Sequence, residues 1–194
     1  MNVDSRIVLR SRPSAKRGPV QRCAGRLCGT LRARYPELRT MQTLEAISDF
    51  LRQKRLAVVG VSRMEKDFTR DMFREFLKRG YDVVPVNPAA TEIEGRRCYA
   101  RVQDISPPVA GALVMTPPKQ SESVAMDCAA AGIGRIWLYR AVGQRAVSKA
   151  AVGFCKANGI SVVPGYCPHM FWKDAAFFHR LHGFLLQISG GWPQ

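Results

Sequence analysis

The residues best suited to bind an anionic ligand follow the first buried apolar run of the chain. Residues 55–60 read RLAVVG, a short continuous run typical of a strand that is buried on both faces. Gly60 allows backbone amides to approach a ligand closely, and Ser62 adds a hydroxyl donor. Arg63 and Lys66 can add charge-assisted hydrogen bonds, and the next helix begins in the same place with its positive end. This pattern predicts a pyrophosphate site, although a glycine that simply ends a strand beside solvated cations would explain it too.

The same segment lacks the usual signatures of two nucleotide-binding classes. In the dinucleotide fingerprint G-x-G-x-x-G, Ser62 and Glu65 would stand where the second and third glycines belong. The acidic residue that would bind a ribose hydroxyl after the second strand is replaced by Asn87. No G-x-x-x-x-G-K-[ST] loop occurs anywhere in the sequence. NAD is therefore disfavoured but kept as an alternative, and an NTPase is disfavoured further.

Strand and helix patterns alternate from Met41 to the C-terminus, which predicts one folded domain over residues 41–194. Thr43 is expected to cap the first helix, and Thr116 to cap a later helix that has Pro117 at its first position and ends at Gly132. The segment 89–106 is irregular, with a short strand near Cys98 and Tyr99. The remaining predicted elements are strands at 55–60, 81–86, 109–115, 135–139 and 160–163, and helices from about 67 to 80, at 145–158 and at 172–188.

Repeated strand-helix-strand units with buried strands predict an α/β fold. We expect a Rossmann-like three-layer sandwich with a mostly parallel sheet and the first strand near its centre. Ligands of such sheets bind outside the carboxyl ends of the strands, where the strand order reverses. The strand ends at 60–63, 86–88, 116–118 and 139–140 are therefore the expected places for chemistry.

The first forty residues form a basic arm with no sustained periodicity. They hold ten Arg or Lys residues against only Asp4 and Glu37, in a chain whose formal net charge is +15. Such a composition predicts a disordered segment. Three explanations remain open: translation that truly starts at Met41, a targeting peptide, or a functional arm that touches nucleic acid or a membrane.

Several motifs together carry a resemblance to a known family. These are VVGVSRMEKDFTRDMFREFLKRGYDVVPVNP from Val58, EIEGRRCYARVQDI from Glu92, the strand around Trp137, and GYCPHMF from Gly165. The chain resembles the small stand-alone CoA-binding domain proteins, which are similar to the CoA-binding domain of succinyl-CoA synthetase and of ADP-forming acyl-CoA synthetases. The resemblance runs from about Leu44 to Met170.

The resemblance implies coenzyme A or acyl-CoA as the ligand and assigns three parts of its site. It does not supply the phosphorylated histidine or the grasp domain of the synthetases, so it implies binding without turnover. By this resemblance the phosphates would lie beside Gly60, Val61 and Ser62, the adenosine end beside Val86, Asn87 and Pro88, and the path towards pantetheine beside Thr116 and Pro117.

The C-terminal region concentrates thiol and imidazole groups. Cys167 follows the last predicted strand, where a CoA thiol could exchange with it if the Cys167 pKa were lowered; a small buried hydrophobe is the alternative. His179 and His182 are three residues apart and could join Cys167 at a metal, but this spacing matches no structural zinc pattern. We therefore place Cys167 among the candidate CoA-contacting residues and assign no metal ligands.

The leading hypothesis is a cytoplasmic, non-catalytic CoA or acyl-CoA binding protein that acts as a carrier, sensor or regulatory partner. The six scattered cysteines suit a reducing compartment, and no apolar run is long enough for a membrane span. A protein partner or a homodimer remains open. The alternatives are an NAD(P)-dependent oxidoreductase or redox sensor and, less favoured, nucleic-acid binding through the basic arm.

Overall fold

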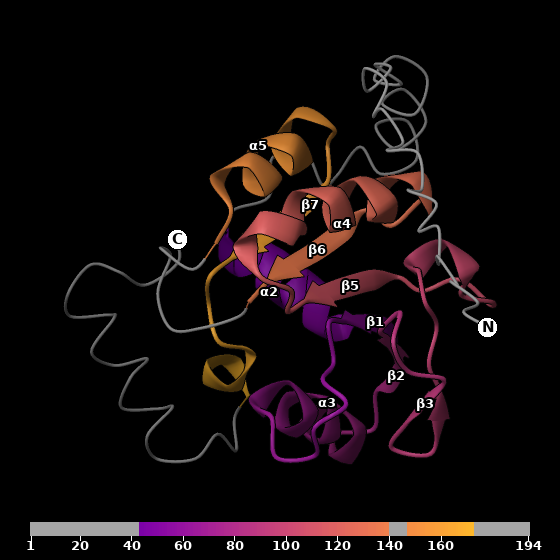
Figure 1. Cartoon of the computed structure of the whole chain (residues 1–194). Helices are drawn as coiled ribbons and strands as arrows, with labels where there is room; N and C mark the ends of the chain where they lie inside the picture. Colours follow the sequence, from indigo (N-terminus) through magenta and orange to yellow (C-terminus); the bar gives the residue numbers. More distant parts are fainter. Residues whose placement is uncertain (1–42, 140–146, 173–194) are drawn as a thin grey trace, which may run out of the picture.

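A five-stranded parallel sheet forms the centre of the computed structural model, which describes residues 43–139 and 147–172 (Figure 1). Its order is β2-β1-β5-β6-β7, and each neighbouring pair is parallel. The strands are β1 (Arg55–Val59), β2 (Asp82–Val86), β5 (Gly111–Val114), β6 (Arg135–Leu138) and β7 (Ser161–Pro164).

The strand order reverses between β1 and β5. From β1 the chain moves outward to β2, then returns to place β5 on the other side of β1. The α/β prediction of a Rossmann-like parallel sheet is confirmed. Crossovers that leave β1 and β5 in opposite directions open a crevice between their carboxyl ends, which is where ligands bind in sheets of this class.

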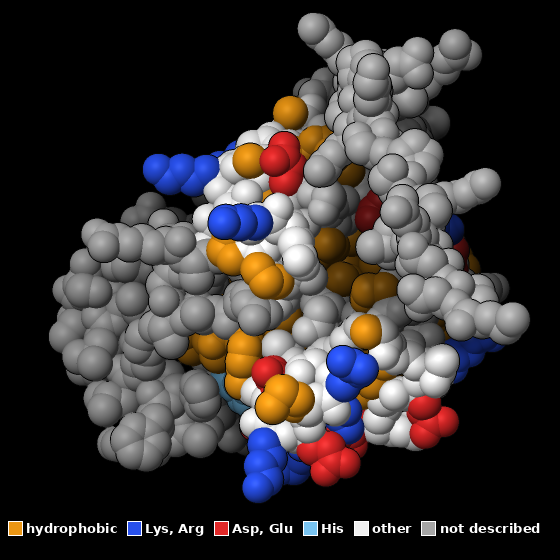
Figure 2. Space-filling view, in the orientation of Figure 1, with side chains coloured by type: hydrophobic (Ala, Val, Ile, Leu, Met, Phe, Trp, Pro, Cys, Tyr) orange, Lys and Arg blue, Asp and Glu red, His pale blue; other side chains and the backbone are white. Residues whose placement is uncertain are grey.

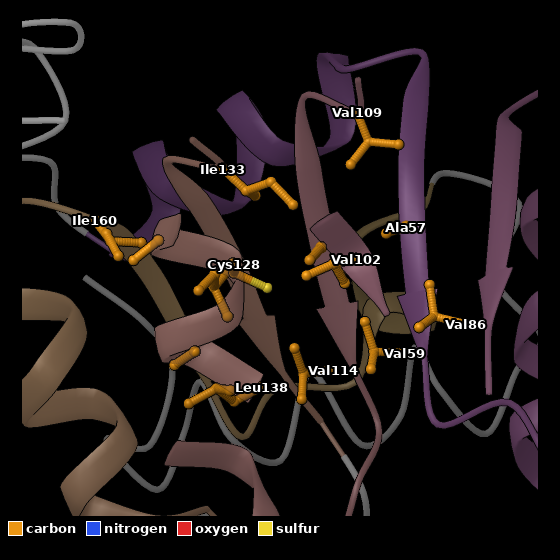
Figure 3. Packing of buried hydrophobic residues seen from close by; sticks show 14 of the residues in the cluster. Ala57, Val59, Val86, Val102, Val109, Val114, Cys128, Ile133, Leu138 and Ile160 are labelled. Atoms are coloured by element: carbon orange, nitrogen blue, oxygen red, sulfur yellow. The ribbon is translucent and has the colours of Figure 1, made fainter. Parts of the chain in front are cut away.

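Two helical layers cover the sheet, which confirms the three-layer sandwich. Helices α2 (Thr43–Arg52) and α3 (Phe68–Lys78) share a buried cluster with Leu56 and Val58 of β1. Helices α4 (Pro118–Ala130) and α5 (Lys149–Ala157) pack on the other face against Ala57 and Val59. Figure 3 shows this second cluster, in which Val59, Val86 and Val102 come from three different segments. Alternate residues of β1 therefore supply the two cores, as a strand buried on both faces requires.

Two predicted helix starts are wrong by one residue. Thr43 is the first residue of α2 rather than its cap. Pro117 is the cap residue of α4, with no side-chain hydrogen bond, and Pro118 rather than Pro117 occupies the first turn. Proline fits the first turn because that position needs no amide hydrogen. Asp67 does cap α3, its carboxylate accepting from the Thr69 amide.

The segment predicted to be irregular holds a small hairpin. It consists of β3 (Glu92–Ile93) and β4 (Arg96–Arg97), paired antiparallel, and is followed by the 3-10 helix η2 (Val102–Asp104). Tyr99 forms a parallel bridge with Val86, so the strand expected near Cys98 and Tyr99 is a single bridge. Hydrogen bonds of Tyr99 with Pro85 and Asn87 hold the chain after the hairpin beside the end of β2.

Ion pairs fasten these elements to one another. The Arg135 guanidinium at the start of β6 donates to the Asp49 carboxylate of α2 at 2.5 Å, with both side chains largely buried. Glu94 of the hairpin pairs with Arg70 at 2.5 Å and with Arg74 at 2.7 Å, both in α3. Each pair joins two segments that lie far apart in the sequence.

In the part of the chain that the structure describes, no helix has the length and apolar character of a membrane span. The basic arm predicted for residues 1–40 and the helix predicted beyond Trp172 lie outside the described residues. The helix predicted over residues 145–158 begins only at Lys149 (α5), because Ser148 caps it there by accepting from the Ala151 amide at 3.2 Å. Arg145 itself lies outside the described residues.

Candidate functional site

A groove of about 400 Å³ opens at the carboxyl edge of the sheet, at the reversal between β1 and β5. Figure 2 shows hydrophobic side chains at the bottom of a hollow on this face. The groove brings together six of the predicted site residues from the ends of β1, β2 and β5: Gly60, Val86, Asn87, Pro88, Thr116 and Pro117. The strand-end rule predicts that these six residues lie together.

Gly60 lets the ends of β1 and β5 approach each other. Its φ is +88°, and a Cβ at this position would lie 3.0 Å from the Thr116 amide nitrogen and 3.1 Å from the Met115 carbonyl carbon. Its own amide donates to the Val86 carbonyl at 2.9 Å. The glycine is therefore required by positive φ and by the neighbouring backbone, and it keeps the floor of the groove free of a side chain.

Asn87 has a bracing role that the sequence did not reveal. Its side-chain nitrogen donates to the Val61 carbonyl at 2.7 Å, and its side-chain oxygen accepts from the Ala89 amide at 2.8 Å. The Val61 side chain itself is fully buried in the core on the α3 face. Asn87 thereby connects the end of β2 with the loop that follows β1, and its amide already has partners on both atoms.

The loop after β1 is held mainly by its own residues. The Ser62 amide donates to the Thr69 hydroxyl at 2.9 Å, and the Ser62 hydroxyl accepts from the Met64 amide at 3.1 Å. Asp67 caps α3 with a carboxylate, so this helix start already carries a negative group. In contrast, no side chain caps α4, whose first turn begins at the groove with Pro117 and Gln120. The uncapped helix start that faces the groove is that of α4.

Two arginines line a second hollow that meets the groove at Pro88. Arg70 is buried and held by Glu94, whereas Arg63 is exposed. Lys66 is exposed on the same loop. Arg63 therefore lies in the hollow next to the groove, and neither Arg63 nor Lys66 is among the described residues that line the groove itself.

The sequence analysis missed the opposite wall of the groove. This wall comes from α4 and from the segment around η2, and its members include Arg101, Val102, Gln120, Ser123, Val124 and Asp127. The four from α4 are spaced i, i+3, i+4 and i+7, which places them on one helical face. This spacing was available once the helix had been predicted. Arg101 and Val102 lie in a segment predicted to be irregular, and the motif that contains them did not indicate that they face the ligand site.

Cys167 lies on the α3 face, packed against the core there, and is not among the described residues that line the groove. Burial raises the pKa of its thiol, although the Tyr139 hydroxyl and the His169 backbone favour the thiolate. The lowered pKa on which thiol exchange depended is therefore not found. Among the residues described, no group of three or more His, Cys, Asp or Glu could hold a metal; His179 and His182 lie outside them.

Comparisons with known proteins identify relatives of this sequence and of its fold. Residues 54–172 match the CoA binding domain family. A conserved hypothetical protein from Pyrococcus furiosus is 29% identical, with a TM-score of 0.54, over 59% of this chain and 95% of its own. A Thermus thermophilus protein is 26% identical, with a TM-score of 0.58, over 66% and 93%. A hypothetical protein from Pyrococcus horikoshii OT3, 24% identical over 66% and 87% with a TM-score of 0.59, shares the fold. A search of curated proteins finds no match.

Proposed function

This chain belongs to the CoA binding domain family, and we propose that its groove at the β1–β5 reversal binds CoA or acyl-CoA. The observation that carries the proposal is the position of the groove within the matched region. It lies at the sheet edge that ligands of this architecture use, and Gly60 leaves its floor open. A volume of about 400 Å³ suits the nucleoside part of CoA but not the whole molecule, so pantetheine must run outside it.

The lining supports one orientation of the ligand. Val59, Val86 and Val102 form an apolar surface inside the groove, which suits a purine ring. The diphosphate would then lie at the open rim near Gly60 and the uncapped start of α4. Arg63, in the adjoining hollow, would provide a cation for the phosphates of the ligand.

We propose a binding role without turnover, as a carrier, sensor or regulatory partner. The thiol most suited to exchange chemistry, Cys167, has a raised pKa and packs against the core rather than the groove. A buried thiol with a raised pKa is a poor nucleophile at neutral pH. The groove supplies shape and polarity for a nucleotide, which is what a binding protein needs.

NAD(P) is the competing ligand because it shares an adenosine diphosphate with CoA. NAD sites bind a ribose hydroxyl with an acidic residue after the second strand, but Asn87 stands at that position here. The nitrogen and the oxygen of the Asn87 side-chain amide both already form hydrogen bonds within the protein. Titration calorimetry of the full chain with CoA, acetyl-CoA, desulfo-CoA and NADH tests the choice. We expect micromolar binding of the three CoA ligands and no response to NADH; the reverse order would refute the proposal.

A variant that blocks the groove tests whether CoA binds there. Ser123 is exposed and lines the groove, so Ser123→Trp should fill it and reduce CoA affinity at least tenfold. Met126 is exposed on the same helix and is not among the groove-lining residues, so Met126→Trp is the matched control. Equal affinity in both variants would show that CoA binds elsewhere.

A further inference from the structure

The far end of the groove is polar and is built from two segments. Asp127 lies in the third turn of α4, and Gln103 lies in η2. The side-chain nitrogen of Gln103 donates to one Asp127 carboxylate oxygen at 2.7 Å. This bond fixes the carboxylate in orientation without neutralising it.

Neighbouring charges leave Asp127 able to accept a further hydrogen bond. Arg101, which also lines the groove, pairs with both carboxylate oxygens of Asp104 at 3.0 and 3.3 Å. Its guanidinium is near enough to Asp127 to interact electrostatically, but it donates its hydrogen bonds at 3.0 and 3.3 Å to Asp104. An ionised carboxylate has about four lone-pair sites, and Gln103 occupies one of them.

The chemistry of this end selects a particular edge of a purine. A carboxylate accepts hydrogen bonds and cannot donate, so it attracts an exocyclic amino group and repels a carbonyl oxygen. We propose that Asp127 reads the 6-amino group of adenine and so makes the groove selective for adenine over a 6-oxopurine; the inference rests on the proposed CoA site. The base would lie against Val59, Val86 and Val102 with its amino edge towards α4.

The experiment compares CoA with deaminated CoA, in which hypoxanthine replaces adenine. Both ligands keep every phosphate, ribose hydroxyl and pantetheine atom, so a contact from Asp127 to any of those would affect them equally. Titration calorimetry on the full wild-type chain should show CoA binding about tenfold tighter, as expected for one hydrogen bond to a charged group in an open groove.

Asp127→Asn is the informative variant. Its side-chain oxygen can still accept from Gln103, while its amide can donate to the hypoxanthine oxygen, so the preference for adenine should fall to about one or reverse. Glu122→Gln removes the same charge from the same helix at an exposed residue that is not among those lining the groove. That control should keep the wild-type preference, and thermal melting should show all three proteins folded.

The outcomes separate this inference from the proposed function. Tight CoA binding with an unchanged base preference in Asp127→Asn overturns the role of Asp127 and leaves the CoA site standing. Absence of CoA binding by the wild-type chain overturns both. Loss of the preference in Asp127→Asn but not in Glu122→Gln supports the inference.

Discussion

Replacing Gly60 by alanine tests whether β1 and β5 need a bare backbone at the groove. Two costs add. A side chain at φ +88° incurs about 1–2 kcal/mol of backbone strain. The new Cβ would also lie 3.0 Å from the Thr116 nitrogen and 3.1 Å from the Met115 carbonyl carbon, and such overpacking costs about 1–3 kcal/mol. We therefore expect Gly60→Ala to lower the free energy of unfolding by about 2–5 kcal/mol, out of about 5–15 kcal/mol for a typical domain.

Gly80 provides the matched control. It has a φ of +78°, but a Cβ there would meet no heavy atom within 4 Å. Gly80→Ala should therefore cost only the strain, about 1–2 kcal/mol. Denaturant unfolding of both variants measures the difference, and calorimetry with CoA shows whether the shifted β5 end also weakens binding.

The difference between the losses in free energy of unfolding of Gly60→Ala and Gly80→Ala measures the cost of the close contact with the end of β5. It should be about 1–3 kcal/mol, with the larger loss at Gly60. Equal losses would refute the argument that close approach, rather than positive φ alone, requires glycine at the groove. A stable Gly60→Ala protein with unchanged CoA affinity would also remove this position from the proposed site.

Three further predictions concern the described core and its ion pairs. Asp49→Asn removes the charge-assisted bond to the largely buried Arg135 and should lower the free energy of unfolding by about 3 kcal/mol in denaturant titration; a loss near zero would contradict this. Burial alone would raise the pKa of Glu94, but hydrogen bonds and charges from two arginines outweigh it and lower that pKa below its ordinary 4.5. Its stabilising contribution should therefore be full above about pH 4.5 and lost as the pH falls through the folded-state pKa, so wild type and Glu94→Gln should converge in stability in acid. Burial raises the pKa of Cys167, so iodoacetamide at pH 8 should alkylate it more slowly in the folded chain than in urea, as quantified by peptide mass spectrometry. Equal rates would show that the thiol is not protected.

The central sheet was predictable because its signals are local. Continuous apolar runs such as residues 55–60 specify strands buried on both faces, and glycines such as Gly80 mark helix ends. Strand ends then follow from the topology rule, which brought Gly60, Asn87 and Thr116 to one edge. Local patterns combined with a general rule of chain topology were therefore sufficient to predict the half of the groove that the strand ends form.

The remaining half depends on contacts between distant segments. The bond between Gln103 and Asp127 joins a 3-10 turn to α4, and neither residue carries a pattern that predicts the other. The Asp67 cap is a local feature that places a negative group at the start of α3. The groove opens beside the start of α4 instead, and only the packed structure shows this. These features depend on how distant segments pack together, and local patterns in a single sequence do not predict such packing.

The division between strand ends and wall has a functional consequence. At the strand ends, Gly60 and Asn87 hold the backbone together, so substitutions there should change stability and ligand binding at the same time. On the wall, Ser123 and Asp127 project from an exposed helical face, so substitutions there should change ligand preference while stability stays near that of the wild type. If the proposed site is correct, we therefore expect substitutions on α4 to alter ligand preference without disturbing the sheet beneath it.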